Sequence, residues 1–215
     1  MKKISPSVLD VEKNKLTNYI DQLVDWGVCN VHYDVMDGIF VNNTALTFQE
    51  IKQVKENCKK HTMDIHLMVK DVFKYYEMYK NIGDILTFHY EAFENSDLEK
   101  MIKQCQKDNV KLGLAIKPNT QVEEIRQYLK HCSLVLIMSV EPGFGGQKFI
   151  ENSFNKIKEL ADIRKALDLN FIIEVDGGVK DQNIAKCFEC GVDLAVVGSY
   201  LVKNFSKETI DQLLK

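Results

Sequence analysis

The chain has only three prolines in 215 residues, and no tract rich in proline, glycine or serine that could act as a linker. With nothing to divide it, we expect one domain over residues 1–215, a length that suits a complete barrel. Hydrophobic residues make up 45% of the chain, so a sufficient core can form without disulfides.

A strong charge of one sign is also lacking. The formal net charge of −3 provides no basic surface for nucleic acid, so no nucleic-acid partner is expected. Residues 1–10 contain no apolar stretch of signal-peptide length, and no later stretch reaches the roughly 18 apolar residues that a membrane span needs. We therefore expect a cytoplasmic protein without a membrane partner.

Six cysteines are scattered along the chain, and in a reducing cytosol we expect free thiols. Cys187 and Cys190 form a C-x-x-C pair, a spacing that could hold zinc or carry out redox chemistry. No second pair accompanies them, and both would lie on one helical face. A structural role is therefore favoured for this pair.

Short apolar runs alternate with longer amphipathic segments throughout the chain. Eight such strand-then-helix units in one domain favour a closed (β/α)8 barrel, also called a TIM barrel. A doubly wound open sheet is the main alternative. The runs cover residues 4–9, 29–36, 63–68, 85–89, 112–116, 134–139, 171–175 and 194–197.

Polar residues interrupt the second run. Side chains alternate along a strand, so His32, Asp34 and Met36 share one face. A histidine and an aspartate on the inner face of a parallel strand cost free energy unless something binds them. A buried His–Asp hydrogen bond is the simpler alternative to a ligand site. The Asp37-Gly38 pair that follows is typical of a turn.

The third and seventh runs repeat this pattern. His66 shares a face with Met68, Asp64 lies two residues before His66, and Asp176 follows the seventh run. Two histidines and two aspartates at three strand ends predict one divalent metal ion, with zinc, iron(II), cobalt or manganese preferred to calcium or magnesium. For His89, which ends the fourth run, a structural role is favoured over support of the ligands.

Glycines follow three strands in the C-terminal half of the chain. They lie in Pro-Gly-Phe-Gly-Gly-Gln at 142–147, in Gly177-Gly178 and in Gly198-Ser199. Glycine lets backbone N–H groups approach an anion closely, and barrels often bind phosphate after strands seven and eight. A phosphate site is therefore predicted at these loops.

Six motifs occur in the order and spacing of one known family. They read SPSVL at 5–9, HYDVMDG at 32–38, DIHLMV at 64–69, GLAIKP at 113–118, VEPGFGGQ at 140–147 and EVDGG at 174–178. Through these motifs, the sequence resembles the ribulose-phosphate 3-epimerase family across nearly its whole length. The family usually has Phe-Val-Pro-Asn after the Asp-Gly turn, whereas this chain has Phe40-Val41-Asn42-Asn43, so the conformation of this loop is open.

The resemblance implies a role for each matching residue. His32, Asp34, His66 and Asp176 match the metal ligands; Asp34 also matches the proton acceptor, and Asp176 the proton donor. Ser7 and His66 match positions that contact the substrate. Apolar cover over the reacting carbons is implied for Met36, Met68 and Met138, with core packing as the alternative. The substrate loops are implied to contain Gly143, Phe144, Gly145, Gly146, Gly177, Gly178, Gly198 and Ser199.

The resemblance thus implies a metal-dependent isomerase of the pentose phosphate pathway that interconverts D-ribulose 5-phosphate and D-xylulose 5-phosphate by two-base proton transfer. The first alternative is an epimerase of the same family for a hexulose phosphate such as allulose 6-phosphate. A barrel lyase of the decarboxylase or hexulose-phosphate synthase type would carry Asp-x-Lys-x-x-Asp, but residues 64–69 contain no lysine. A non-catalytic sugar-phosphate sensor is disfavoured by four metal-capable ligands. Barrels of this kind often associate, so a homo-oligomer is among the expectations.

Overall fold

A computed structural model describes residues 2–215, in which each of the eight predicted runs forms a strand. Most strand limits lie within one or two residues of the predicted ones. The first strand, however, ends three residues before Leu9, because the Ser7 hydroxyl accepts the Leu9 N–H at 3.2 Å and the chain turns there. The strands are β1 (Lys3–Pro6), β2 (Asn30–Met36), β3 (Thr62–Met68), β4 (Ile85–His89), β5 (Lys111–Ile116), β6 (Leu134–Met138), β7 (Ile172–Asp176) and β8 (Leu194–Val197).

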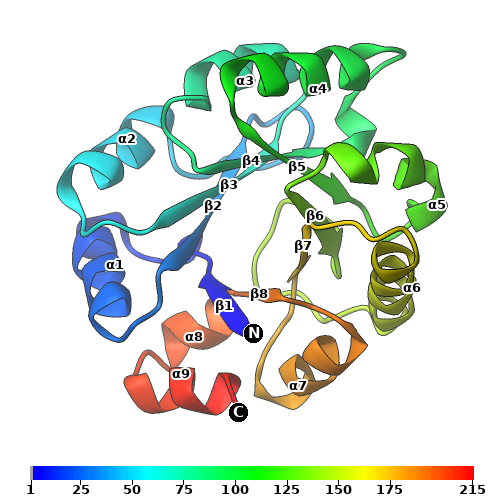
Figure 1. The fold of residues 1–215 in the computed structure, drawn as a ribbon. Helices are drawn as coiled ribbons and strands as arrows, with labels where there is room; N and C mark the ends of the chain where they lie inside the picture. The colour runs from blue at the N-terminus through cyan, green and yellow to red at the C-terminus, as the bar shows by residue number, and fades with distance from the viewer. Residues whose placement is uncertain (1) are drawn as a thin grey trace.

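The strands form one parallel sheet that closes into a barrel (Figure 1). Each strand pairs with its sequence neighbour, and β1 pairs with β8. Between β1 and β2 the contact is a parallel bridge from Ser7 to His32, with the Val8 N–H donating to the His32 carbonyl at 3.2 Å. The predicted (β/α)8 barrel is therefore confirmed, and the open doubly wound sheet is excluded.

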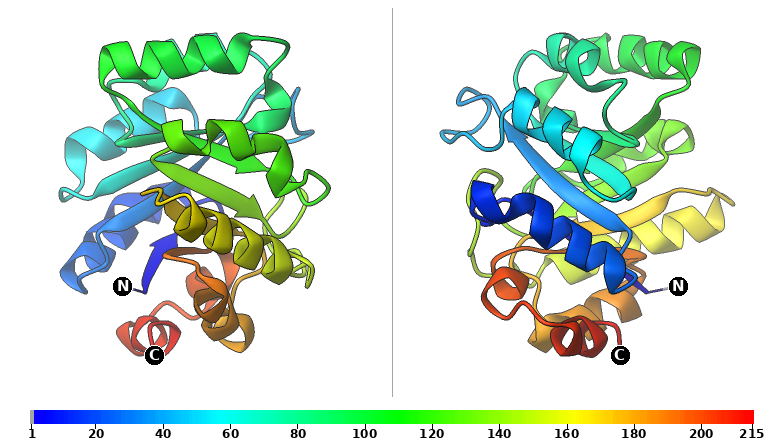
Figure 2. Two further views of the ribbon diagram at one scale, coloured as in Figure 1. Left: turned by 45° about the vertical axis from the view of Figure 1, so that its right-hand side comes forward. Right: turned by 90° about the vertical axis from the view of Figure 1, so that its left-hand side faces the viewer.

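Helices surround the barrel, and the side views in Figure 2 show them packed outside the strands. In the first helix Leu16, Ile20 and Leu23 are buried against the sheet, as an amphipathic pattern requires. The helices are α1 (Leu16–Asp25), α2 (Phe48–Asn57), α3 (Val72–Tyr79), α4 (Asp97–Asp108), α5 (Val122–Ile125), α6 (Ser153–Ala166), α7 (Asp181–Cys190), α8 (Ser199–Lys203) and α9 (Lys207–Leu213), with short 3₁₀ turns at Lys13–Lys15, Tyr90–Ala92 and Arg126–His131.

The inside of the barrel is divided into an apolar and a polar part. Ala115, Leu136, Met138 and Leu194 belong to an apolar cluster on strands β5, β6 and β8. Strands β1 to β4 and β7 instead carry buried polar side chains. These side chains are Ser5, His32, Asp34, Asp64, His66, Thr87, His89 and Glu174, and the buried Ser7 directly follows β1.

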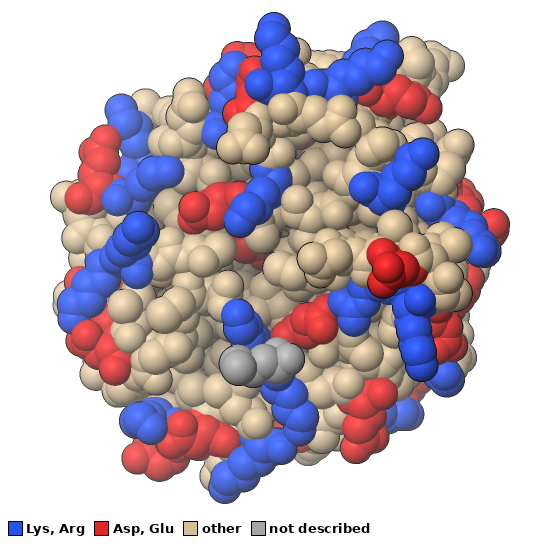
Figure 3. All heavy atoms as spheres, in the orientation of Figure 1, with Lys and Arg blue, Asp and Glu red and all other residues tan. Residues whose placement is uncertain are grey.

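The surface charges and the cysteines agree with the expectations from the sequence and indicate no further functional site in residues 2–215. Lysine and arginine alternate with acidic residues on the face seen in Figure 3. No helix within residues 2–215 has the length and apolar character to cross a membrane. All six cysteines are free thiols, as predicted; Cys187 is fully buried on α7, and Cys190 is half-buried.

Candidate active site

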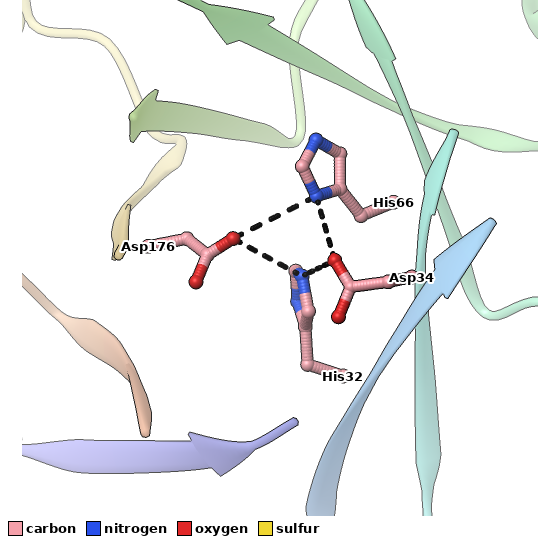
Figure 4. Close-up of side chains that lie close together, drawn as sticks. All are labelled: His32, Asp34, His66 and Asp176. Carbon is pink, nitrogen blue, oxygen red and sulfur yellow. Dashed lines mark ion pairs between the residues drawn. The ribbon is translucent and has the colours of Figure 1, made fainter. Parts of the chain in front are cut away.

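Four side chains converge at the C-terminal ends of three strands (Figure 4). His32 and Asp34 come from β2, His66 from β3 and Asp176 from the end of β7. Asp34 Oδ1 lies 3.6 Å from His32 Nε2 and 3.3 Å from His66 Nδ1. Asp176 Oδ2 lies 3.8 Å from each of the same two nitrogens. All four donor atoms lie within 4.8 Å of one another, so they surround one point.

This donor set fits a divalent metal ion. Donors at about 2.0–2.2 Å from one tetrahedral ion are roughly 3.3–3.6 Å apart, close to the separations found here. His32 Nε2 and His66 Nδ1 are buried and have no hydrogen-bond partner among residues 2–215. Buried polar atoms are almost always paired, and an ion held by the four donors would account for both nitrogens. Mixed imidazole and carboxylate ligands suit zinc, iron(II), cobalt or manganese.

His32 is held in place by Asp64 from β3. The two side chains are buried, and His32 Nδ1 lies 2.6 Å from Asp64 Oδ2. Because a carboxylate only accepts, the proton of His32 lies on Nδ1, which leaves the lone pair of Nε2 facing the cluster. The Thr87 hydroxyl also donates to Asp64, at 3.4 Å. Asp64 therefore orients His32 and is not itself part of the four-donor set.

Glu174 is a further buried acid behind His32. It lies two residues before Asp176 on β7, and its Oε1 is 3.8 Å from His32 Nδ1. Neither of its carboxyl oxygens has a hydrogen-bond partner among the residues described. Burial, together with the nearby Asp64 carboxylate, raises the pKa of Glu174 well above its usual range. Such surroundings favour the neutral acid.

The two carboxylates of the cluster have different environments. Asp34 Oδ2 accepts a hydrogen bond from Ser7 Oγ at 2.8 Å. Burial alone would raise the pKa of Asp34, but His32 and His66 outweigh burial and hold that pKa well below its usual range. Burial dominates at Asp176 and raises its pKa to about 6. The ionised form is thus favoured more strongly at Asp34 than at Asp176.

A cavity opens at the cluster, and the expected substrate-binding residues gather there. Asp34 and Asp176 line it together with three buried methionine side chains. His32 and His66 belong to the adjoining cluster. The other expected residues that line the cavity are Ser7, Met36, Met68, Met138, Gly143, Phe144, Gly145, Gly146, Gly177, Gly178, Gly198 and Ser199.

The glycine-rich part of the wall offers backbone groups. Gly178 has φ +64°, and a Cβ there would lie 2.6 Å from Phe149 N and 2.7 Å from Gln147 O, so only glycine fits. The N–H groups of Gly178 and Gly198 donate to no backbone acceptor within the described chain. Free backbone donors in a glycine-lined cavity form a site that an anion can use.

The loop that departs from the family pattern is tied to the glycine-rich loop after β6. Asn43 Nδ2 donates to the Gly143 carbonyl at 2.7 Å. Val41 is buried, and a Cβ on Gly143 would lie only 3.1 Å from it. Asn42, which stands where the family has proline, is exposed. The neighbours of Asn42 therefore fix the course of this loop.

The turn predicted at Asp37-Gly38 is confirmed. Asp37 Oδ1 accepts the N–H groups of Ile39 and Phe40, both at 2.8 Å, and Gly38 has φ +74°. The turn places the Phe40 ring against His89, with centroids 4.9 Å apart.

The sequence pattern largely misses the residues behind the four donors. It marks Asp64 only as a neighbour of His66 and assigns no role to Glu174. It favours a structural role for His89, whose Nε2 lies 2.9 Å from Nε2 of His66. The available signal was the alternation along strands, because Asp64 shares a face with His66, and Glu174 shares one with Asp176.

Comparison with known proteins agrees with the resemblance seen in the sequence. Residues 3–202 match the family described as the ribulose-phosphate 3 epimerase family. The chain is 37% identical over 206 residues to the ribulose-phosphate 3-epimerase of Bacillus subtilis, an alignment that covers 93% of this chain and 91% of that protein. It is 32% identical over 200 residues to the enzyme of the same name from Aquifex aeolicus, with 93% and 89% covered.

Solved structures of other proteins share the fold. A mutant tryptophan synthase alpha-subunit from Pyrococcus furiosus superposes with a TM-score of 0.72 at 14% identity, covering 99% of this chain and 97% of that one. A 3-hexulose-6-phosphate synthase superposes with a TM-score of 0.68 at 13% identity, covering 99% and 100%. At such low identity, these similarities concern the barrel alone.

Proposed function

The chain belongs to the ribulose-phosphate 3-epimerase family, and on that premise we propose that it interconverts D-ribulose 5-phosphate and D-xylulose 5-phosphate in the cytoplasm. It is thus an isomerase that moves a proton at C3 of a sugar phosphate. One observation carries the assignment of the site. Carboxylates from two different strands, Asp34 and Asp176, converge within 4.8 Å beside a glycine-lined cavity.

The metal ligands in this proposal are His32, Asp34, His66 and Asp176. A bound zinc, iron(II), cobalt or manganese ion would supply positive charge that stabilises the negative charge developing on the substrate during the reaction. Asp64 keeps the His32 lone pair directed at the cluster, and Ser7 holds the second oxygen of Asp34. These contacts orient the ligands before substrate arrives.

Proton transfer is the task of the two aspartates. Inversion at C3 next to a ketone needs a base on one face of a planar enediolate and an acid on the other. We assign removal of the C3 proton of ribulose 5-phosphate to Asp34 and delivery of the new proton to Asp176. Met36, Met68 and Met138 line the cavity with apolar groups that keep water from the intermediate.

The phosphate group is assigned to the glycine-rich loops. Gly177, Gly178, Gly198 and Ser199 follow β7 and β8, the usual phosphate position in barrels, and they line the same cavity as the aspartates. Backbone N–H groups would provide most of the contacts. Unphosphorylated ribulose should therefore be a very poor substrate, because the binding energy of the phosphate no longer helps to reach the transition state.

Isotope labelling in heavy water tests the two-base assignment. After a single turnover, the product should carry deuterium at C3, whereas recovered ribulose 5-phosphate should carry much less. The Asp176→Asn variant, with metal retained, should exchange the C3 proton slowly through Asp34 while it forms almost no xylulose 5-phosphate. Normal epimerisation by this variant would show that Asp176 is not the acid.

A second assay separates the pentulose from the hexulose substrate. Turnover of ribulose 5-phosphate should exceed turnover of allulose 6-phosphate when both are measured side by side with the same metal-loaded protein. The reverse order would favour the hexulose-phosphate epimerase instead.

A further inference from the structure

A chain of hydrogen bonds leads from His66 away from the metal ligands. His66 Nε2 lies 2.9 Å from His89 Nε2, and His89 Nδ1 lies 3.2 Å from Glu91 Oε2. Both histidines are fully buried, so bulk solvent does not compete for these hydrogen bonds. His89 ends β4, and Glu91 lies in the turn that follows it.

The outer end of this chain is fixed to the backbone. Glu91 Oε1 accepts the Lys117 N–H at 2.7 Å and the Thr120 hydroxyl. The buried Lys156 ammonium donates to the Lys117 carbonyl at 2.8 Å and so holds the same loop from the other side. Both oxygens of Glu91 are therefore engaged, and the carboxylate cannot turn without losing these bonds.

If an ion is bound, only one arrangement of protons is possible along this series of hydrogen bonds. Two nitrogens 2.9 Å apart share one proton. If His66 Nδ1 binds an ion through its lone pair, the proton of His66 lies on Nε2 and His89 Nε2 must accept it. The proton of His89 then lies on Nδ1, where it meets the Glu91 carboxylate, which can only accept.

We propose that His89 and Glu91 are positioning residues, which hold His66 in the tautomer whose Nδ1 lone pair faces the four-donor cluster. This inference rests on the proposed metal-assisted function, and it assigns a role to two residues outside the ligand set. The two histidine ligands are supported differently: His32 by one carboxylate directly, and His66 by a carboxylate that acts through a second imidazole.

The Glu91→Gln variant exchanges donor and acceptor at the outer end of this series of hydrogen bonds. A glutamine whose oxygen keeps the Lys117 N–H presents its NH₂ group to His89 Nδ1, which must then accept. His89 Nε2 would carry the proton, and the lone pair of His66 would turn away from the cluster. Zinc affinity, measured by competition with a chromophoric chelator, should fall about 10- to 100-fold, as for other groups that orient a ligand. Glu94→Gln, which changes an exposed carboxylate paired with Lys70, is the control and should leave the zinc affinity unchanged.

Two substitutions at His89 separate positioning from packing. The amide of His89→Gln can accept from His66 and donate to Glu91, whereas His89→Leu fills the space but accepts nothing. We expect near-normal zinc affinity for His89→Gln and a loss of about 10- to 100-fold for His89→Leu. Thermal unfolding of the metal-free proteins shows whether both variants fold. Equal zinc affinity of the two folded variants would overturn the proposal.

A direct readout is the position of the protons. Long-range ¹H–¹⁵N correlation at pH 8, on zinc-loaded protein with labelled histidine, should show His66 protonated on Nε2 and His89 on Nδ1. A proton on Nε2 of His89 would overturn the proposal even if the protein epimerises normally. Failure of the wild-type protein to bind zinc would instead contradict the proposed function, because zinc content is measured before the tautomers are read.

Discussion

The two sides of the barrel mouth present different kinds of groups to the cavity: side chains on one side and backbone on the other. On the β2–β3 side, the active groups are side chains of His32, Asp34 and His66, each with a buried partner behind it. On the β6–β8 side, glycines bring the backbone itself to the cavity wall. Asp176 joins the two sides, since it completes the cluster and directly precedes Gly177-Gly178.

The difference follows from the two tasks. A metal ligand or a base must hold one atom in one direction, which requires further hydrogen bonds behind it. An anion needs several donors at close range, which requires side chains to be missing. Substitutions on the β2–β3 side should therefore affect metal binding and kcat, and those on the β6–β8 side should affect affinity for phosphorylated ligands.

Removal of the metal should have the largest effect, because it takes the positive charge from the β2–β3 side as a whole. Chelation is expected to abolish epimerisation, and zinc, iron(II), cobalt or manganese should restore part of it. Metal analysis and turnover of ribulose 5-phosphate provide the measurement. Full activity of exhaustively metal-free protein would contradict the metal assignment.

Replacement of a single carboxylate should have the second-largest effect. Asp34→Asn removes the proposed base and should lower kcat by at least the ~10²–10⁴ typical of a lost general base. If the comparison between the two sides is correct, binding of inorganic phosphate to this variant stays within a few-fold of normal. A comparable loss in phosphate binding would show that the two sides do not act separately.

Gly198→Val tests the β6–β8 side. A bulky side chain should block backbone donors from the phosphate; each hydrogen bond to a charged group contributes about 1.5–3 kcal/mol, or roughly 10- to 100-fold in affinity. Binding of every phosphorylated ligand should weaken while metal content stays normal. Gly198→Ala is the milder control, because its Cβ would lie 3.6 Å from the Ser7 Cβ, an ordinary contact. Loss of metal from Gly198→Val would argue against separate sides.

Asn43→Ala should have the smallest effect. It removes the 2.7 Å hydrogen bond to the Gly143 carbonyl that ties the two sides together across the mouth. A net contribution of about 0.5–1.5 kcal/mol per hydrogen bond predicts a change of only a few-fold in KM, with kcat little altered. Asn42→Ala, a change at an exposed neighbour, should show no such effect. If both variants behave alike, the interloop bond has no role in substrate binding.

Much of this architecture could be predicted because strands appear in the sequence as short apolar runs with alternating faces. Alternation along β2 placed His32 and Asp34 on one face, and the eight apolar runs indicated the barrel. The C-terminal ends of parallel strands meet at one face of a barrel, so polar residues there were expected to gather. The structure brings together His32, Asp34, His66 and Asp176, as predicted.

The residues behind the four donors were harder to predict, because they depend on contacts between residues 23 and 32 positions apart, beyond the reach of a local pattern. Asp64 lies next to His66 in the sequence pattern, yet it bonds His32 across the sheet, since the register sets His32 opposite Asp64. Likewise, His89 reaches His66 only because β3 and β4 pair with His66 opposite Thr87, two residues before His89.

The sequence by itself determined the residue types, their spacing and the strand ends on which they lie, since these depend on local periodicity and turn chemistry. Only the tertiary structure decided which nitrogen of each histidine faces the cluster and which buried acid stands behind it. Those choices depend on the register between strands and on side-chain rotamers inside a closed barrel. Distances of a few ångströms between atoms far apart in the chain fix them, and no local pattern encodes such distances.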